Sequence, residues 1–464
     1  MSLSPYQPTT GLDSFGLQKA LAGEKRKLMT KELVGCCTKP RPNLLDKFFP
    51  NPSESQPILD ALGDKYGEVD RPTAKNPHGR RAKDHLKRGW KGRPKPPEGK
   101  EPPNYKENSI AAAFIPILNA IIAKLGRNDS RVAVDRQNVP ILTRDGGALK
   151  PDIFLWGKGS SAFAPVDGTP SSRMGSKREV DTEVAHQGRG VSEDVTPIDW
   201  PWCVIPIEVK TDLERGGPEN TVALNQLSTY VREVFTAQEN RRFVPSLVLT
   251  ECTVEFLVWD RAGVVASERL DYRTYALLFC HMLKCLVTWD DHQLGFDPNV
   301  FYCNEELHIQ TREPAEYVIE ETLVRSYTIR SRGSTCWRVR KLDAEGAPGT
   351  SYLIQDSWVK GGMRAENTIL RRIEGVRPHV ADGIPAVLPL VHIEEVRIEI
   401  PGSIGRRDTV LHNRREDSPM DVVDPVHTRT VLRCRTRDCV PLADFVSLEE
   451  LVGALHDAIK GMFI

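Results

Sequence analysis

The sequence lacks a net charge and long apolar runs. Its 464 residues carry 63 basic and 63 acidic side chains, so the formal net charge at pH 7 is zero. The overall charge therefore gives no reason to expect a nucleic-acid or membrane-surface partner. No apolar stretch is long enough to cross a bilayer and no secretory signal is recognisable. These absences predict an intracellular protein, cytoplasmic or nuclear, with no membrane partner.

The ten cysteines lack the spacing of a metal site. The closest ones in sequence are Cys36 with Cys37, Cys280 with Cys285, and Cys434 with Cys439. None belongs to a pair of CxxC motifs, which is the pattern of a structural zinc site. Scattered thiols favour a reducing compartment over a secreted, disulfide-stabilised protein.

Residues 1–104 lack apolar periodicity. Proline, glycine and basic residues dominate, and the segment 79–100, GRRAKDHLKRGWKGRPKPPEGK, carries a dense positive cluster. One interpretation is a disordered, basic, Pro-rich tail. The other is an arm for nuclear localisation or for contact with nucleic acid. Both interpretations predict little fixed structure.

A different pattern begins at residue 105. Apolar residues recur at helical spacing from Glu107 to Leu125, with Pro116 inside the run. Strands are predicted at 131–142, 149–156 and 202–210, and a helix at 220–239. Residues 157–198 are rich in glycine, serine and charge without any period, which predicts a disordered insertion. We expect residues 105–300 to form one α/β domain.

Asp152, Glu208 and Lys210 are the candidate catalytic residues of this domain. Two carboxylates on strands can hold a divalent metal that activates water, and a lysine can stabilise negative charge on a phosphate. The pattern resembles the PD-(D/E)XK motif of restriction-endonuclease-like folds, and Gln226 with Tyr230 matches the QxxxY helix of some members. Three interpretations remain open: a metal-dependent nuclease, an inactive nuclease-like fold, and another α/β arrangement.

The segment 327–370 organises the rest of the chain. It predicts a strand, a turn at Gly333, a second strand, a loop, a third strand and a helix, which is the order of a protein-kinase small lobe. Its words RSRGSTCWRV, QDSW and RAENTIL resemble the fungal-type protein kinases, whose pattern is roughly RG(T/S)xxWxV, KDSW and RxExxIL. Further words such as KPDIFLW, IPIEVK and WDRAGVVAS extend this resemblance from about residue 105 to the end.

The resemblance implies a fold and an activity. Residues 301–464 would form a kinase small lobe, a five-stranded antiparallel sheet with one helix, followed by the start of a large lobe. The family uses ATP and magnesium to transfer the γ-phosphate to serine or threonine. The ATP site would include Gly333, Gln355 and Glu366.

Two departures from the family pattern bear on activity. Gln355 stands where the family has a lysine, so no positive charge reaches the phosphates and Glu366 loses its ion-pair partner. The sequence also ends before a His-Arg-Asp-like catalytic loop. Arg407 and Asp408, followed by Asn413, have the spacing of that loop, but they precede the hinge segment and no Asp-Phe-Gly follows. We interpret this match as coincidence.

These departures predict a truncated and catalytically inactive kinase-like chain, for which ATP and magnesium binding are doubtful. One alternative is a PD-(D/E)XK nuclease with Asp152 and Glu208 as metal ligands. Another is an interaction scaffold, because the predicted helix 448–460 has an apolar face with no large lobe to cover it. That face predicts a protein partner, and the basic tail leaves nucleic acid open as a second one.

Overall fold

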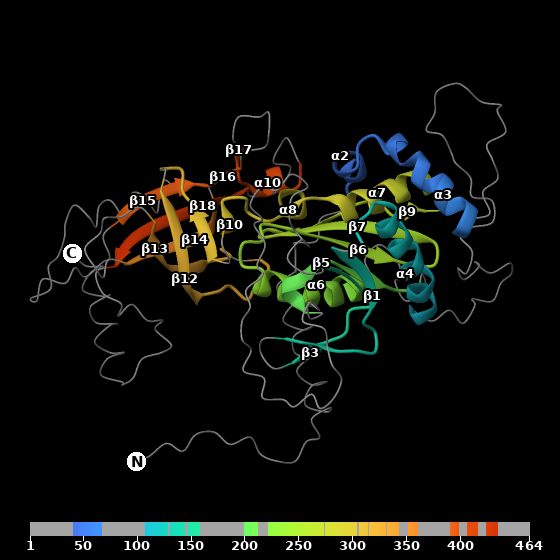
Figure 1. Cartoon of the computed structure of the whole chain (residues 1–464), viewed down its shortest axis with the longest axis horizontal. Helices are drawn as coiled ribbons and strands as arrows, with labels where there is room; N and C mark the ends of the chain where they lie inside the picture. Colours follow the sequence, from blue (N-terminus) through green and yellow to red (C-terminus); the bar gives the residue numbers. More distant parts are fainter. Residues whose placement is uncertain are drawn as a thin grey trace, which may run out of the picture.

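The structure is a computed structural model. It describes residues 40–66, 107–128, 130–143, 147–157, 199–211, 221–272, 274–303, 306–313, 315–330, 332–342, 351–360, 390–398, 406–415 and 424–434. The described parts form two seven-stranded sheets side by side, the first coloured cyan to green and the second orange to red (Figure 1). Four predicted features lie outside these residues: the basic cluster 79–100, the insertion 158–198, Glu366 and the helix 448–460.

The first sheet mixes parallel and antiparallel strands. In spatial order it consists of β1 (Arg131–Asp135), β4 (Ile153–Gly157), β5 (Cys203–Val209), β6 (Val244–Leu249), β7 (Thr253–Asp260) and β8 (Gly263–Ala266), with β9 (Leu270–Asp271) beside β7. Only β5 and β6 are parallel among these pairs. A parallel pair requires a crossover, and α6 (Thr221–Ala237) provides it. The predicted strand 131–142 is interrupted after Asp135, because β2 (Ile141–Leu142) forms a separate hairpin with β3 (Ala148–Leu149).

Helices cover both faces of the first sheet. α4 (Glu107–Lys124) and α7 (Ala276–Thr288) share one apolar core with β5 and β6, whereas α6 packs into a second core on the opposite face (Figure 1). Both faces of β4 and β5 are buried, which explains why their sequences, IFLWG and CVIPIEV, are almost continuously apolar. Glu208 is the exception in β5, because it is an acidic residue in a strand that is buried on both faces.

Residues 40–66 differ from the disordered tail expected for 1–104. They form α2 (Leu44–Phe48), η1 (Pro52–Ser55) and α3 (Gln56–Tyr66). Phe48 and Phe49 are buried against the first sheet, and the Phe49 ring stacks on Trp289 with centroids 5.5 Å apart. The helical segments are short, so the sequence shows little periodicity. Burial of adjacent aromatic side chains provides the stabilisation.

The second sheet is antiparallel throughout. In spatial order it consists of β10 (Val300–Cys303), β11 (Glu306–Gln310), β12 (Glu316–Val324), β13 (Thr335–Lys341), β14 (Ser351–Lys360), β18 (Pro425–Cys434) and β15 (Leu390–Glu395). It therefore has two strands more than the predicted five-stranded sheet. A small ladder of β16 (Arg397–Ile398) and β17 (Arg406–Arg407) precedes α10 (Val410–Asn413).

One predicted strand of this sheet is wrong. Residues 327–330 lie in a loop, and the strand before Gly333 ends at Val324. Side chains of the first domain bind the carbonyl groups that a strand neighbour would otherwise bind: Arg232 donates to Tyr327 O and Arg261 donates to Thr328 O, each at 2.8 Å. Satisfied backbone groups remove the need for a strand partner.

Buried charges hold the two sheets together. Arg414, which follows α10, donates from Nε and Nη2 to both carboxylate oxygens of Asp260 at 2.6 and 2.8 Å. Glu239, just beyond α6, accepts hydrogen bonds from Trp337 Nε1 at 3.1 Å and from Arg325 Nη2 at 2.9 Å. All five side chains are at most 9% exposed. Since unpaired charges are costly away from water, these pairs fix the relative position of the sheets.

The Arg414–Asp260 pair predicts a large stability effect. Replacement Asp260→Ala leaves the Arg414 guanidinium buried without its carboxylate, so we expect a loss of about 3–5 kcal/mol of unfolding free energy. The exposed pair Arg340–Glu306, 3.9 Å apart, provides the control, and Glu306→Ala is expected to cost less than about 1 kcal/mol. Urea unfolding of the three proteins measures both effects. Equal losses in the two variants would contradict the role of the buried pair.

Candidate functional site

The first candidate site lies where β4 begins and β5 ends. Because β4 and β5 are antiparallel with Ile153 opposite Ile207, Asp152 and Glu208 come to adjacent positions. Asp152 Oδ2 accepts a hydrogen bond of 2.8 Å from the N–H of Val209. Asp152 is 5% exposed and Glu208 is fully buried. The fold thus brings together two carboxylates that are 56 residues apart in sequence.

Lys210 completes a buried charge cluster with these carboxylates. Its Nζ lies 2.6 Å from Glu208 Oε1 and also donates a hydrogen bond to Glu107 at the first turn of α4. Burial lowers the pKa of Lys210, but the negative charges of Glu208 and Glu107 outweigh it and raise the pKa overall. Lys210 is therefore a cation, 5% exposed, between two glutamates.

The glutamate and the aspartate are poorly solvated as anions. Burial, followed by the nearby Asp152 charge, raises the pKa of Glu208 well above its usual range. Burial also raises the pKa of Asp152, against the opposing hydrogen bond from Val209. Apart from the ion pair with Lys210, neither Glu208 oxygen makes a well-directed hydrogen bond within the described residues. Such oxygens fit either a shared proton or a divalent cation.

Gln226 and Tyr230 lie on α6 beside the same strands. Gln226 Nε2 donates to Tyr230 Oη at 2.8 Å, and Tyr230 Oη donates to the carbonyl oxygen of Lys150 at 2.9 Å. The pair therefore binds the backbone just before Asp152. The sequence pattern grouped these residues correctly in space, but it missed Glu107. An acidic residue in the first turn of a helix gives only a weak signal, because that position is common for helix stability alone.

The second candidate site is the predicted ATP site, and its two described members lie on different elements. Gln355 is in the middle of β14, opposite Cys336 on β13 and Thr430 on β18. Gly333 lies in the loop between β12 and β13 with φ of +54°. A Cβ there would lie 2.6 Å from Nε of Arg261, so glycine allows the loop to contact the first domain.

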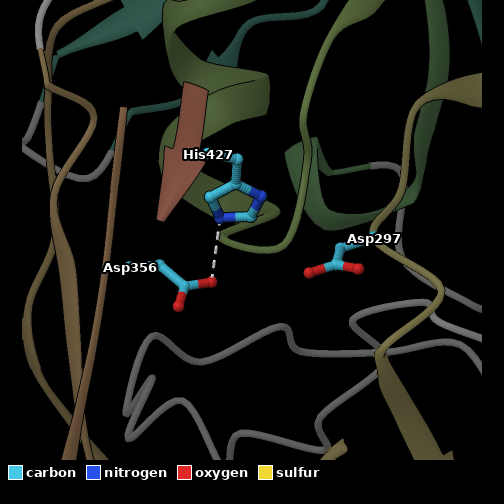
Figure 2. Close-up of side chains that lie close together, drawn as sticks. All are labelled: Asp297, Asp356 and His427. Carbon is cyan, nitrogen blue, oxygen red and sulfur yellow. Dashed lines mark hydrogen bonds and ion pairs between the residues drawn. The ribbon is translucent and has the colours of Figure 1, made fainter. Parts of the chain in front are cut away.

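A third cluster surrounds Asp356, the residue after Gln355. Asp297, Asp356 and His427 point toward one another, from the turn after α8 (Asp291–Leu294), from β14 and from β18 (Figure 2). Their oxygen and nitrogen atoms lie within 4.8 Å of one another, as metal ligands do. However, Arg429 Nη2 donates to Asp297 at 2.8 Å and to Asp356 at 2.7 Å. The guanidinium already supplies the positive charge, so these residues form an ion-pair network.

The network continues through the histidine. His427 Nε2 lies 3.1 Å from Asp356 Oδ2, and Nδ1 lies 2.9 Å from Asp408 Oδ2. Asp408 also accepts a hydrogen bond of 3.0 Å from Arg242 Nη1. Burial alone lowers the pKa of His427, but the two aspartates raise it to about 9. Asp356 has a pKa below its usual range because Arg429 and His427 outweigh the effect of burial.

Sequence reasoning recognised the QDSW word but missed what its residues do. The Trp358 ring stacks on His427 with ring centroids 4.9 Å apart, and the backbone N–H of Trp358 donates to Arg332 O at 2.6 Å. Asp356 binds Arg429, and Trp337 of the word STCWRV binds Glu239. These motif residues therefore make contacts inside the protein and between the sheets.

The match of Arg407, Asp408 and Asn413 to a catalytic-loop spacing also has a structural account. Asp408 and Asn413 both accept hydrogen bonds from Arg242 Nη1, at 3.0 and 3.1 Å. Asp408 is fully buried between that arginine and His427. Asp408 and Asn413 thus anchor the segment around α10 to the turn between α6 and β6 through Arg242.

Sheets and helices together define a mixed α/β protein, consistent with a kinase-like fold. The family model described as fungal protein kinase matches residues 180–463, more than half of the chain. The chain belongs to the fungal protein kinase family. No curated protein and no solved structure matches it. Within the described ranges, no helix has the length and apolar character needed to cross a membrane.

The His427 network predicts a pH-dependent stability. A folded pKa of about 9 against an ordinary 6.5 means that the imidazolium stabilises the fold fully below pH 6.5. This contribution is lost as the pH rises through about 9, and we expect it to be on the order of 1–3 kcal/mol. His427→Gln should therefore be less stable than the parent at pH 6.5.

The control for this prediction is the difference between parent and variant across pH. Buried thiols such as Cys203 also make the fold less stable at high pH, because burial raises the pKa of the Cys203 thiol in the folded protein. This effect is the same in the parent and in the variant. Thermal unfolding midpoints between pH 6.5 and 9.5 should converge. Parallel curves would show that His427 is not charged in the folded protein.

Proposed function

We propose that the second sheet of this fungal protein kinase family member is a kinase-type small lobe that does not transfer phosphate. The observation that carries this proposal is Gln355 at the centre of β14. The strand order β12-β13-β14-β18-β15 supports the small-lobe interpretation. In the sequence β15 follows β14, but in the sheet β15 lies at the edge and the last strand, β18, lies between β14 and β15. In a kinase the third strand holds the lysine that binds the phosphates.

The neighbours of Gln355 do not replace that lysine. Side chains directly opposite one another in a sheet share a face, and both cross-strand neighbours of Gln355, Cys336 and Thr430, are neutral. Arg338 lies on the same face two residues further along β13, but its guanidinium binds Glu321 at 2.6 Å. The triphosphate of ATP would thus meet an amide where the chemistry requires a cation.

The small lobe then serves as a binding module joined to the first domain. Two residues of the motifs STCWRV and QDSW are used for packing. Trp337 binds Glu239, and Asp356 binds Arg429, which also binds Asp297. This use does not depend on nucleotide. A scaffold role for the chain follows, in which the kinase-type sheet provides shape and the phosphoryl-transfer chemistry is lost.

Nucleotide binding tests the role of Gln355. We expect the parent chain to transfer no phosphate from MgATP to a generic protein substrate. Gln355→Lys should bind MgATP about tenfold more tightly than the parent, because the added ammonium pairs with the phosphates. Gln355→Met, which is similar in size and neutral, provides the matched control and should behave as the parent does. Calorimetric titration measures binding, and γ-phosphate transfer by the parent would overturn the proposal.

A metal-dependent nuclease is the second candidate function, and the convergence of Asp152, Glu208 and Lys210 favours it. The order α4, β1, β4, β5, α6, β6, with β5 and β6 parallel across α6, supports a restriction-endonuclease-like domain. Glu208 and Asp152 would hold the cation, which would activate water for attack on a phosphodiester. Lys210 is paired with Glu107 in the structure, so this pair must break before Lys210 can reach a phosphate.

Manganese binding tests this second candidate. We expect calorimetry to detect one Mn²⁺ bound by the parent chain and none by Glu208→Gln, since the amide offers a weaker ligand. Glu316→Gln, in the second sheet beside His308, is the matched control and should bind as the parent does. Cleavage of plasmid DNA in Mn²⁺ should follow the same order. Binding without cleavage would favour an inactive nuclease-like fold, and absence of both would exclude the nuclease.

A further inference from the structure

A cavity of about 630 Å³ opens where the first domain meets the segment around α10. Its walls come from the turn after α6, from α8, from β17 and from α10, and Figure 1 shows α8 and α10 close together between the two sheets. Neither the residues around Asp152 nor Gln355 line it. The cavity is therefore distinct from both sites considered above, and its size is that of a small-molecule site.

Positive charge dominates the wall of this cavity. Four arginines line it, Arg242, Arg406, Arg407 and Arg415, against one carboxylate, Asp424. The charge of Arg242 is balanced by the buried Asp408. Arg406 and Arg407 are exposed on β17, and Arg407 Nη1 forms an exposed ion pair with Glu395 at 3.4 Å. An excess of positive charge thus faces the cavity.

Two histidines of the cavity respond to this charge. Burial, then the positive charge of Arg242, lowers the pKa of His292 to about 3. Burial also lowers the pKa of His412, with Arg242, Arg406 and Arg415 adding to the effect and Asp408 opposing it. Both imidazoles are neutral near pH 7, so the arginines set the sign of the local potential. Nearby cations that disfavour a further proton favour an anion for the same reason.

Two residues of the cavity wall, Asn413 and His412, also contain buried polar atoms that have no partner in the described part of the chain. Asn413 is 4% exposed, and its Oδ1 accepts from Arg242 Nη1, which directs its amide nitrogen elsewhere. That Nδ2 is buried and makes no hydrogen bond within the described residues, and neither does Nδ1 of His412. A buried donor without an acceptor is costly, and native proteins usually provide a partner.

The groups around the cavity are held in place before any ligand arrives. Pairing of Arg397 with Arg407 and of Ile398 with Arg406 positions β17, and Thr409 Oγ1 caps α10 by accepting from the N–H of His412. Arg415 Nη1 donates to Lys47 O at 2.7 Å, and its guanidinium lies 4.3 Å from the Phe48 ring centre. Donors that are already positioned, such as the guanidinium of Arg415, lower the ordering cost of binding an anion.

We propose that this cavity binds a small molecule that carries several phosphate groups. The planar guanidinium groups of Arg406 and Arg407 match phosphate oxygens in a two-pronged geometry, and Arg415 adds a third guanidinium to the wall. The cavity of about 630 Å³ is larger than a single phosphate group fills, so it has room for a molecule that carries several of them. A nucleoside polyphosphate and an inositol polyphosphate share the required chemistry, and the experiment below separates them.

Calorimetric titration of the full chain tests the proposal with three probes: inorganic tripolyphosphate, ATP without magnesium, and inositol hexakisphosphate. We expect tripolyphosphate to bind the parent chain. The double variant Arg406→Gln/Arg407→Gln should bind it at least about tenfold more weakly. Both arginines are exposed, so the variant should fold. The control Arg340→Gln/Arg433→Gln removes the same charge from exposed positions of the second sheet and should bind as the parent does.

The comparison among probes identifies the source of the phosphates. Stronger binding of ATP than of inositol hexakisphosphate would indicate a nucleotide, and the reverse order would indicate an inositol phosphate. Asn413→Asp places a negative charge at the buried donor and should weaken every probe that binds the cavity. Equal binding by the parent and by Arg406→Gln/Arg407→Gln, or no binding of any probe by the parent, would overturn the proposal. Neither result bears on Gln355→Lys, so the two proposals fail independently.

Discussion

The structure depends on a chain of buried opposite charges that runs between the two seven-stranded sheets. Arg242 binds Asp408, Asp408 binds His427, His427 binds Asp356, and Asp356 binds Arg429. A buried charge is tolerated only when its partners are in place, so loss of any member leaves another uncompensated. The chain therefore makes the position of each sheet a condition for the stability of the other. Two sheets with separate apolar cores become one cooperative unit.

This network of buried charges explains what the residues of the QDSW motif contact. Asp356 and Trp358 of QDSW share one face of β14, where they contact Arg429 and His427 of β18, while Gln355 points to the opposite face. The two faces of one strand thus carry different demands. The buried charge network requires Asp356, and Trp358 packs on its His427, whereas no contact of this network involves the side chain of Gln355. A protein can therefore change residue 355 and still keep Asp356 and Trp358 for packing.

The sequence predicted individual helices and strands better than the contacts between them. Runs such as CVIPIEV and the helical spacing from Glu107 were sufficient for β5 and α4, because burial on both faces or on one stripe leaves a local pattern. The loop at 327–330 was not predictable, since its carbonyls are bound by Arg232 and Arg261 from the other domain. Arg429 and His427 were missed for the same reason: their partners lie as far away as Asp297.

The position of β18 has a consequence for the order of folding. It lies between β14 and β15 and pairs with β14 along ten residues, so the middle of the second sheet is filled by the last of its strands to be synthesised. The first sheet is complete at β9, more than 150 residues earlier. During translation the early domain can therefore form its own core first. The later sheet waits for a distant segment, a nonlocal closure that slows folding and leaves β14 with an open edge until then.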